Sequence, residues 1–257
     1  MLITVKTYPE ASRSYEETVC TAGIRRDGGF VRLYPVRFRG LRVEQQYRKY
    51  QWVRVRAARN TSDPRPESYR PDLESLTTLG VPLPSDGNWR ERKRLVLPYA
   101  SASMEDLWDQ CASRRTSLGL VRPAEVTDLT VEPCEREWEP GRLQWMRQTK
   151  LFGSAIKPLP RLPYRFRYAF RCRDPRCRGH ESMIRDWELG SLYFKQLGRT
   201  GSESQAVDAV RHKFLNELFA PSKDSYLFMG NMREHENSWI VLGVFWPPRE
   251  EQLTLGV

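Results

Sequence analysis

Residues 17–37, ETVCTAGIRRDGGFVRLYPVR, decide how the first part of this chain folds. Apolar and polar side chains alternate on both sides of Arg26-Asp27-Gly28-Gly29, which is the pattern of two strands joined by a tight turn. Pro35 has no backbone N–H to donate, so the second strand ends there or lies at a sheet edge. The segment therefore predicts a β-hairpin.

The sequence on either side of this hairpin extends the strand-rich region. Residues 2–6 and 51–58 alternate as strands do, and residues 41–49 allow a short helix. Residues 60–90 are rich in Pro, Ser, Asp and Gly, and they predict a long loop with at most one helical turn at 72–79. The N-terminal half is thus expected to form a mixed sheet or a partly open barrel.

The second half combines strands with helices. A polar break at 133–142 suggests two lobes within a single domain, a β-rich basic lobe at 1–135 and an α+β lobe at 136–257. The fold class predicted for the whole chain is α+β, with helices and a closing β-hairpin in the C-terminal half. Strands are expected at 125–132, 164–172, 225–231 and 238–246, and helices at 103–115, 181–197 and 203–219.

Positive charge is concentrated in two segments of this chain, whose net charge is +10 over 257 residues. Residues 25–59 carry 11 Arg or Lys against two acids, and residues 161–178 carry seven Arg against Asp174. Such patches are typical of proteins that bind a polyanion, and solvated basic faces are the alternative. A GC-rich genome would explain the excess of Arg over Lys but not the clustering.

Two of the predicted strands would carry arginine on one face. In YRFRYAFR, residues 164–171, aromatic side chains alternate with arginine, so the rings are expected in the core and the arginines outside. If the sheets are contiguous, these arginines extend into a track for phosphates. The nucleic-acid-binding residues predicted are Arg32, Arg37, Arg39, Arg54, Arg56, Arg165, Arg167 and Arg171.

Cys172, Cys177 and His180 are the candidate metal ligands. Asp174-Pro175 favours a turn between the cysteines, and the spacing allows three ligands to surround one ion. A closed structural zinc site needs a fourth ligand, for which Cys134, His212 and His235 are candidates at no recognised spacing. The alternative is a pair of ordinary cysteines and a histidine that caps a helix.

Acidic residues supply the candidate catalytic groups. Asp186 and Glu188 are close in sequence, and clustered carboxylates with a lysine hold Mg²⁺ in metal-dependent nucleases. On a continuous helix, however, Glu181, Glu188 and Lys195 would share a face while Asp186 points elsewhere. Glu67, in the loop, and His235, in the hairpin turn Glu234–Asn237, complete the candidate catalytic set, and solvated acids are the alternative for each.

These observations lead to three hypotheses of function. The first is a protein that binds DNA or RNA through phosphates, in prokaryotic genome defence or DNA processing. The second is a nuclease or base-processing enzyme that uses Asp186 and Glu188, and the third is an interaction subunit that docks on an acidic protein partner. No Walker A loop, Rossmann fingerprint, nucleophile elbow or zinc-protease motif is present.

The sequence also predicts where the protein is located. It has no signal peptide, and its longest apolar run, Trp239–Trp246, is too short to cross a bilayer. We therefore expect a cytoplasmic protein without a membrane partner, whose cysteines are thiols or ligands.

Overall fold

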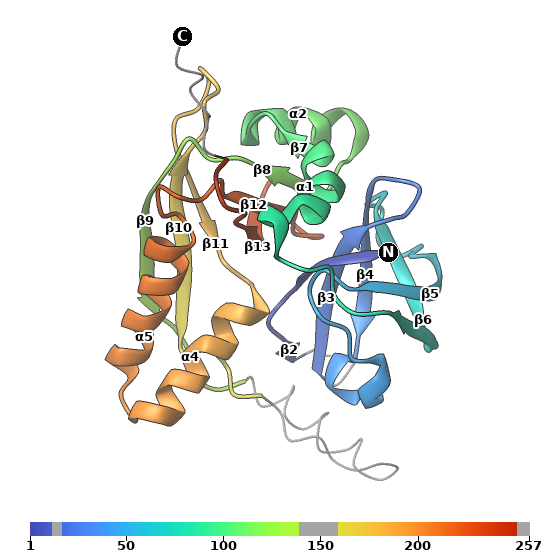
Figure 1. The fold of residues 1–257 in the computed structure, drawn as a ribbon, viewed down its shortest axis with the longest axis horizontal. Coiled ribbons are helices and arrows are strands. Elements are labelled where there is room, and N and C mark those ends of the chain that lie inside the picture. The colour runs from blue at the N-terminus through green and yellow to red at the C-terminus, as the bar shows by residue number, and fades with distance from the viewer. Residues whose placement is uncertain (12–16, 139–158, 251–257) are drawn as a thin grey trace.

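The N-terminal half of the chain is a closed barrel, and the C-terminal half packs helices against two further sheets (Figure 1). The computed structural model describes residues 1–11, 17–138 and 159–250. The predicted α+β class is confirmed, including a barrel in the first half and a closing hairpin in the second.

Five strands close the barrel in the order β1-β5-β6-β4-β3, because β3 pairs back onto β1. All neighbouring strands are antiparallel except β4 and β6. The strands are β1 (Leu2–Lys6), β3 (Glu17–Ile24), β4 (Phe30–Val36), β5 (Trp52–Arg59) and β6 (Ser68–Leu79), and a short β2 (Glu10–Ala11) adds to β3.

The hairpin predicted at 17–37 is confirmed as β3 and β4, with Gly28 and Gly29 both at positive φ in the turn. The long loop predicted at 60–90 is wrong, because β6 fills much of it and completes the barrel. Its polar, proline-containing sequence reflects a strand with an exposed face, which composition alone does not separate from a loop. Short helical turns lie between β4 and β5, η1 (Phe38–Gly40) and η2 (Val43–Gln45), and after β6, η3 (Gly87–Trp89), α1 (Arg90–Val96) and η4 (Leu97–Tyr99).

The C-terminal half contains two sheets. One has the order β11-β10-β9 and the other β13-β12-β8-β7. α4 and α5 lie beside β9 and β10 in Figure 1, and aromatic and aliphatic side chains fill the space between them. The elements are β7 (Ala100–Ser101), α2 (Met104–Arg114), β8 (Leu118–Val121), β9 (Glu125–Pro133), β10 (Tyr164–Arg171), β11 (His180–Met183), α4 (Trp187–Thr200), α5 (Glu203–Arg211), the π-helical turn η6 (His212–Glu217), β12 (Tyr226–Asn231) and β13 (Trp239–Phe245).

The helix predicted at 181–197 begins later than expected. His180–Met183 forms a strand, and α4 starts after Asp186, whose carboxylate accepts a hydrogen bond from the amide of Glu188. Glu181 is therefore on a different element from Glu188. The helices predicted at 103–115 and 203–219 are found, the first capped by Ser103 as its sequence indicates.

The barrel and the C-terminal half are in direct contact. Thr7, beyond the end of β1, bridges to Asp186, and a Cβ at Gly190 of α4 would lie only 2.2 Å from the ring of Tyr8. The two-lobe division near residue 135 stays a prediction, although β9 and β10 pair across that break. None of the described helices is long and apolar enough to span a bilayer.

Candidate functional site

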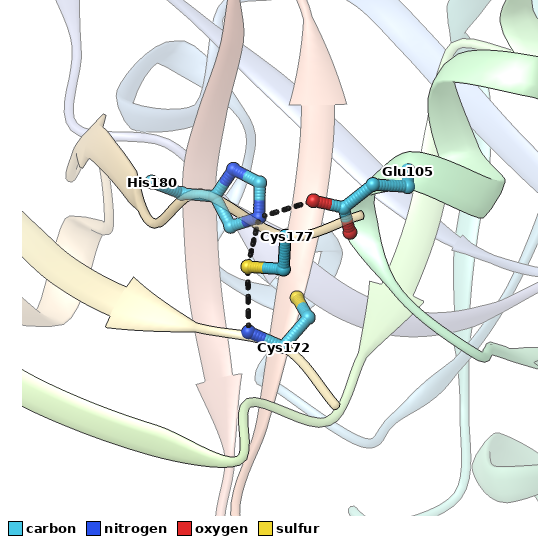
Figure 2. Close-up of side chains that lie close together, drawn as sticks. All are labelled: Glu105, Cys172, Cys177 and His180. Atoms are coloured by element: carbon cyan, nitrogen blue, oxygen red, sulfur yellow. Dashed lines mark hydrogen bonds and ion pairs between the residues drawn. The ribbon is translucent and has the colours of Figure 1, made fainter. Parts of the chain in front are cut away.

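Four side chains that can bind metal converge between α2 and the β10–β11 turn. Glu105, Cys172, Cys177 and His180 each offer one donor atom, and these atoms all lie within 4.8 Å of one another. Figure 2 shows the side chains pointing toward a common centre, with Glu105 arriving from α2. His180 Nε2 lies 3.1 Å from Glu105 Oε1 and 3.2 Å from Cys177 Sγ.

Local sequence explains how the β10–β11 turn presents its ligands. The backbone N–H of Cys177 donates to Asp174 O, and the amide of Cys172 donates to Cys177 Sγ at 3.2 Å. Gly179 adopts φ +96°, which returns the chain to place His180 at the start of β11. Ser103 Oγ donates to Asp174 Oδ2, so the first turn of α2 is held against this turn.

The donor set fits a metal ion. Glu105 is 4% exposed; its Oε1 contacts His180 Nε2 at 3.1 Å, and its Oε2 has no hydrogen-bond partner among the residues that the structure describes. A buried carboxylate with so few partners is costly unless a cation neutralises it. Ligand atoms around a tetrahedral zinc with bonds of roughly 2.0–2.3 Å are roughly 3.3–3.8 Å apart. His180 Nε2 lies slightly closer than this to Glu105 and Cys177, and all four donor atoms are within 4.8 Å of one another.

Burial affects two members of this cluster in opposite ways for metal binding. Burial lowers the pKa of His180, against the effect of Glu105, and so favours the neutral imidazole that ligates metal. Burial raises the pKa of Cys172 to about 12, so without a cation this thiol keeps its proton. The described residues thus hold a candidate metal centre that includes the three ligands predicted from sequence.

The fourth ligand predicted from sequence was wrong. Cys134 Sγ contacts Leu162 O at 3.3 Å, His212 pairs with Glu217, and His235 is in the β12–β13 turn. Glu105 takes that position instead. No sequence signal identifies it, because acids are common in the first turn of any helix.

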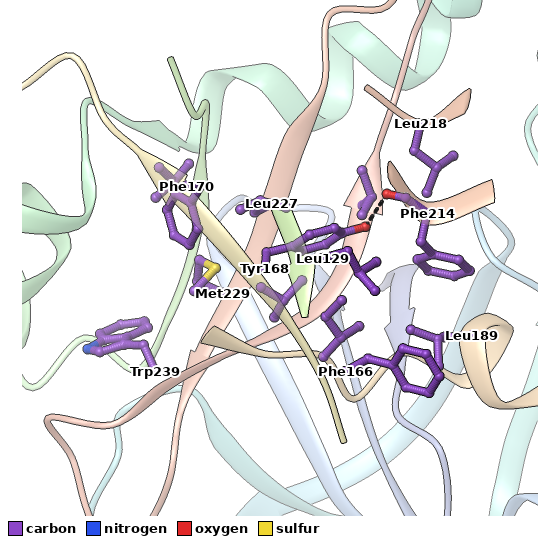
Figure 3. Close-up of a cluster of buried hydrophobic side chains, with 14 of the residues drawn as sticks. Leu129, Phe166, Tyr168, Phe170, Leu189, Phe214, Leu218, Leu227, Met229 and Trp239 are labelled. Atoms are coloured by element: carbon purple, nitrogen blue, oxygen red, sulfur yellow. Dashed lines mark hydrogen bonds between the residues drawn. The ribbon is translucent and has the colours of Figure 1, made fainter. Parts of the chain in front are cut away.

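The aromatic side chains of β10 are buried, as their alternation predicts. Phe166, Tyr168 and Phe170 are at most 1% exposed, and Tyr168 donates a hydrogen bond to Phe214 O at 2.6 Å (Figure 3). These rings belong to the core, so they are not available for stacking on bases.

The arginine face of β10 is charge-balanced by glutamates. Arg165 is paired in register with Glu132, and Arg171 with Glu125. Arg167 Nε lies 3.6 Å from Glu132 and 3.9 Å from Glu181. Three arginines thus face three acids, which weakens this face as a phosphate track. β10 also belongs to a separate sheet from β4 and β5, so the condition for a continuous arginine track, that the sheets be contiguous, is not met.

A groove lined by residues of the barrel strands is richer in unbalanced positive charge. It has a volume of about 900 Å³ and runs between the barrel strands and the segment formed by α1 and η4. Four arginines and one glutamate are among its lining residues, together with three partly buried aromatic rings. We call this the barrel groove, and its arginines and rings are Arg25, Arg26, Arg54, Arg94, Trp52, Tyr69 and Tyr99.

Exposure makes the arginines of the barrel groove accessible. All four are exposed; Arg25 contacts Asp27 at 3.5 Å and Arg94 contacts Glu91 at 3.2 Å, both in solvent-exposed pairs. Such exposed pairs contribute little and open readily. Of the eight arginines predicted from sequence to bind nucleic acid, Arg54 is in this groove. Sequence reasoning missed Arg25, Arg26 and Arg94, although the first two follow the strand signal directly.

Arg32 was predicted to bind nucleic acid, and the structure contradicts this because the side chain is buried. It is 3% exposed and donates to Ser117 Oγ at 3.1 Å and Ser117 O at 2.9 Å. Glu67, predicted as catalytic, accepts hydrogen bonds from the amide and hydroxyl of the same Ser117. Both residues join the barrel to the start of β8, and they form a structural contact.

The remaining predicted arginines are on the barrel. Arg37 is exposed and Arg39 is half-buried, on either side of Phe38 at η1. Arg56 is exposed but bonds to Asp72 through Nε at 3.2 Å and a terminal nitrogen at 2.9 Å. None of the three lines the barrel groove.

Asp186 and Glu188 are brought together by a lysine from the barrel. Lys49 Nζ lies 3.3 Å from Asp186 Oδ2 and 2.8 Å from Glu188 Oε2. Burial raises the pKa of Asp186 to about 6. Burial opposes ionisation of Glu188 as well, but Lys49 outweighs it and holds the pKa of Glu188 below its usual range.

The other predicted catalytic residues are elsewhere. Glu67 is bound to Ser117, and His235 is exposed in the β12–β13 turn. Lys49 was not among the sequence candidates, which included only Lys195 as a lysine on the same predicted helix face as Glu188. The described structure thus assembles an Asp-Lys-Glu cluster and leaves Glu67 and His235 outside it.

Comparison with known families follows the two halves of the fold. Residues 100–256 match the family described as Domain of unknown function (DUF8757). The chain belongs to this family. Residues 1–98 match a second one, Domain of unknown function (DUF8758). No curated protein matches the chain in sequence.

The two family matches meet at η4 and separate the sites. The candidate metal centre falls within the DUF8757 part, whereas all lining residues of the barrel groove except Tyr99 fall within the DUF8758 part. The Asp-Lys-Glu cluster joins the two parts, since Lys49 comes from one and both acids from the other.

Proposed function

We propose that this protein binds single-stranded nucleic acid through the barrel groove. The observation that carries the proposal is the gathering of four exposed arginines around a groove with three aromatic rings. Arginine pairs with phosphate as a planar fork, and aromatic rings stack on unpaired bases of any sequence. A duplex keeps its bases stacked inside, so the rings favour a single strand.

The barrel architecture adds a second argument. Five strands closed as a Greek-key barrel form the OB fold, whose members bind oligonucleotides and oligosaccharides. The likeness concerns architecture alone, and function depends on the site. It therefore supports the proposal only because the groove has the charge and the rings that a strand requires.

The test is titration of a fluorescently labelled oligonucleotide at several salt concentrations. We expect log K to fall linearly with log salt, by about 0.7 for each phosphate contacted. Arg54→Ala/Arg94→Ala should weaken binding and reduce this slope. Arg165→Ala/Arg171→Ala removes the same charge from the balanced β10 face and should change binding little. No binding at about 50 mM salt, or an equal loss in both variants, would overturn the proposal.

We further propose that the cluster of Glu105, Cys172, Cys177 and His180 holds a structural zinc ion. Two thiolates and an imidazole favour zinc over magnesium or calcium, and four protein ligands close the site to substrate. Zinc would fasten α2 to the β10–β11 turn. Elemental analysis of the purified full chain should find one zinc per molecule, and protein free of any transition metal would contradict this.

The same experiments also test the two other hypotheses, a nuclease and a subunit that binds an acidic protein. A Mg²⁺-dependent nuclease at Asp186 and Glu188 would need the ion close to the ammonium group of Lys49, which already contacts both carboxylates. Cleavage of the oligonucleotide that depends on Mg²⁺ would favour it. If the groove binds an acidic protein instead, oligonucleotides fail to bind and the protein is purified free of nucleic acid.

A further inference from the structure

A pocket of about 430 Å³ lies beside the Asp-Lys-Glu cluster, between α4, α5, η6 and the end of β13. Its wall is mainly apolar and includes Leu192, Phe214, Val244 and Trp246. Small-molecule sites are commonly pockets of about 300–1,000 Å³ with apolar walls and a few polar groups that fix orientation. We call it the α4–α5 pocket.

The polar groups of the α4–α5 pocket differ in how many of their atoms already make hydrogen bonds or ion pairs. Glu217 contacts two side chains of one wall, with Oε2 2.6 Å from Lys213 Nζ and Oε1 3.2 Å from His212 Nδ1. On the other side, Asp186 accepts from the Glu188 amide through Oδ1 and from Lys49 through Oδ2. These contacts leave little capacity for an anionic ligand.

Glu188 is the acidic group of the pocket that remains open. Its Oε2 accepts from Lys49, and its Oε1 has no hydrogen-bond partner among the residues that the structure describes. The side chain is 55% exposed and lines the pocket. At Glu188 the available polar atom is thus a carboxylate oxygen, which accepts a hydrogen bond but cannot donate one. Gln196 also lines the pocket, and its Oε1 accepts a hydrogen bond from Arg199.

We propose that the α4–α5 pocket binds an aromatic heterocycle with an exocyclic amino group, the chemistry shared by adenine and cytosine. The amino group donates to Glu188, and the planar ring lies against the apolar wall. The pocket is separate from the barrel groove, and its occupant is either a free nucleoside or an unpaired base of a strand.

The contact with Lys49 favours the ionised form of the Glu188 carboxylate. By holding the pKa of Glu188 below its usual range, Lys49 keeps the carboxylate ionised at neutral pH. Asp186 is a positioning residue, since it caps α4 and holds Lys49 without facing the open oxygen. Gly243 makes this arrangement possible, because a Cβ there would lie 3.1 Å from Asp186 Oδ2 and 3.5 Å from Lys49 Nζ.

The test compares nucleosides that differ at one group, by isothermal titration calorimetry with the full chain. Adenosine should bind, and inosine, which has a carbonyl oxygen in place of the amine, should bind at least about tenfold more weakly. Cytidine and uridine should show the same order. Failure of both adenosine and cytidine to bind at millimolar concentration, or equal affinity for inosine, would overturn the proposal.

A single variant tests the acceptor directly. The amide of Glu188→Gln can both donate and accept, so the preference for adenosine over inosine should disappear. Glu234→Gln changes an exposed acid of the β12–β13 turn and should keep the preference. Glu188 is exposed, so the substitution should not disturb folding, and circular dichroism checks this.

Two further measurements distinguish ligand binding in the α4–α5 pocket from oligonucleotide binding in the barrel groove. Arg54→Ala/Arg94→Ala should lose oligonucleotide affinity and bind adenosine as the wild type does. A strand whose adenines are replaced by hypoxanthine should bind more weakly only if the pocket takes a base from the strand. If it does not, adenosine binding identifies a free nucleoside as the occupant.

Discussion

Glu105 Oε1 lies 3.1 Å from His180 Nε2, although the two residues come from a helix and a strand far apart in the sequence. The carboxylate is buried with no partner for its second oxygen, burial lowers the pKa of the imidazole, and both lie close to two cysteine sulfurs. This contact adds a fourth candidate ligand to the three-ligand motif.

Glu105→Gln should reduce zinc affinity at least about tenfold, since even residues that only orient ligands contribute 10–100-fold. It should also lower the Tm, because metal binding by a structural site adds to folding stability. Competition with a chromophoric chelator measures the affinity. Glu181→Gln, at an exposed acid beside His180, is the control. Unchanged affinity in Glu105→Gln would mean that the carboxylate is not a ligand.

Gly243→Ala should destabilise the protein by about 1–3 kcal/mol, because the new methyl group crowds the Lys49–Asp186 pair and Asp186 is fixed by the start of α4. Gly198→Ala, in α4 with no atom within 4 Å of the new Cβ, should stabilise by about 0.5–1 kcal/mol through helix propensity. Urea unfolding compares the two. Equal effects would show that Gly243 does not shape the cluster.

Lys49→Met should cost about 3–5 kcal/mol, since it leaves the buried carboxylate of Asp186 without its cation. Asp186→Asn keeps an N-cap acceptor and removes the charge. The double variant should therefore recover part of the stability lost in Lys49→Met. Strictly additive costs in this double-mutant cycle would mean that the two residues are not coupled.

Lys6 gives the clearest pH dependence. Burial lowers its pKa to about 8, against the effects of Glu188 and Asp186, while its ammonium lies 3.4 Å from the ring centre of Phe38. Between that pKa and the unfolded value of about 10.4, the unfolded chain binds more protons, so the free energy of unfolding should rise with pH. The free energy of unfolding of Lys6→Met should not show this rise with pH, because methionine does not titrate. Chemical denaturation of both proteins at pH 7.5–10 measures the difference, and parallel curves would contradict the shift.

Local pattern was enough for much of the fold. The turn Arg26–Gly29, the alternation in residues 164–171 and the helix at 103–115 each depend on neighbours in the chain, and each is found where it was predicted. The β6 strand was missed because its residues carry a loop-like composition. Its strand conformation is fixed by pairing with β4 and β5, which sequence does not display.

The sequence by itself determined the α+β class, the burial of the β10 aromatics and three of the four candidate metal ligands. Only the tertiary structure decided which charges meet: Glu105 completes the metal cluster, Lys49 joins Asp186 to Glu188, Arg32 is buried and Glu125 and Glu132 balance the β10 arginines. The physical reason is how far apart in the sequence the interacting residues are. Strand alternation and helix caps are set by bonds between near neighbours, whereas the pairing of charges depends on chain closures that bring distant residues together.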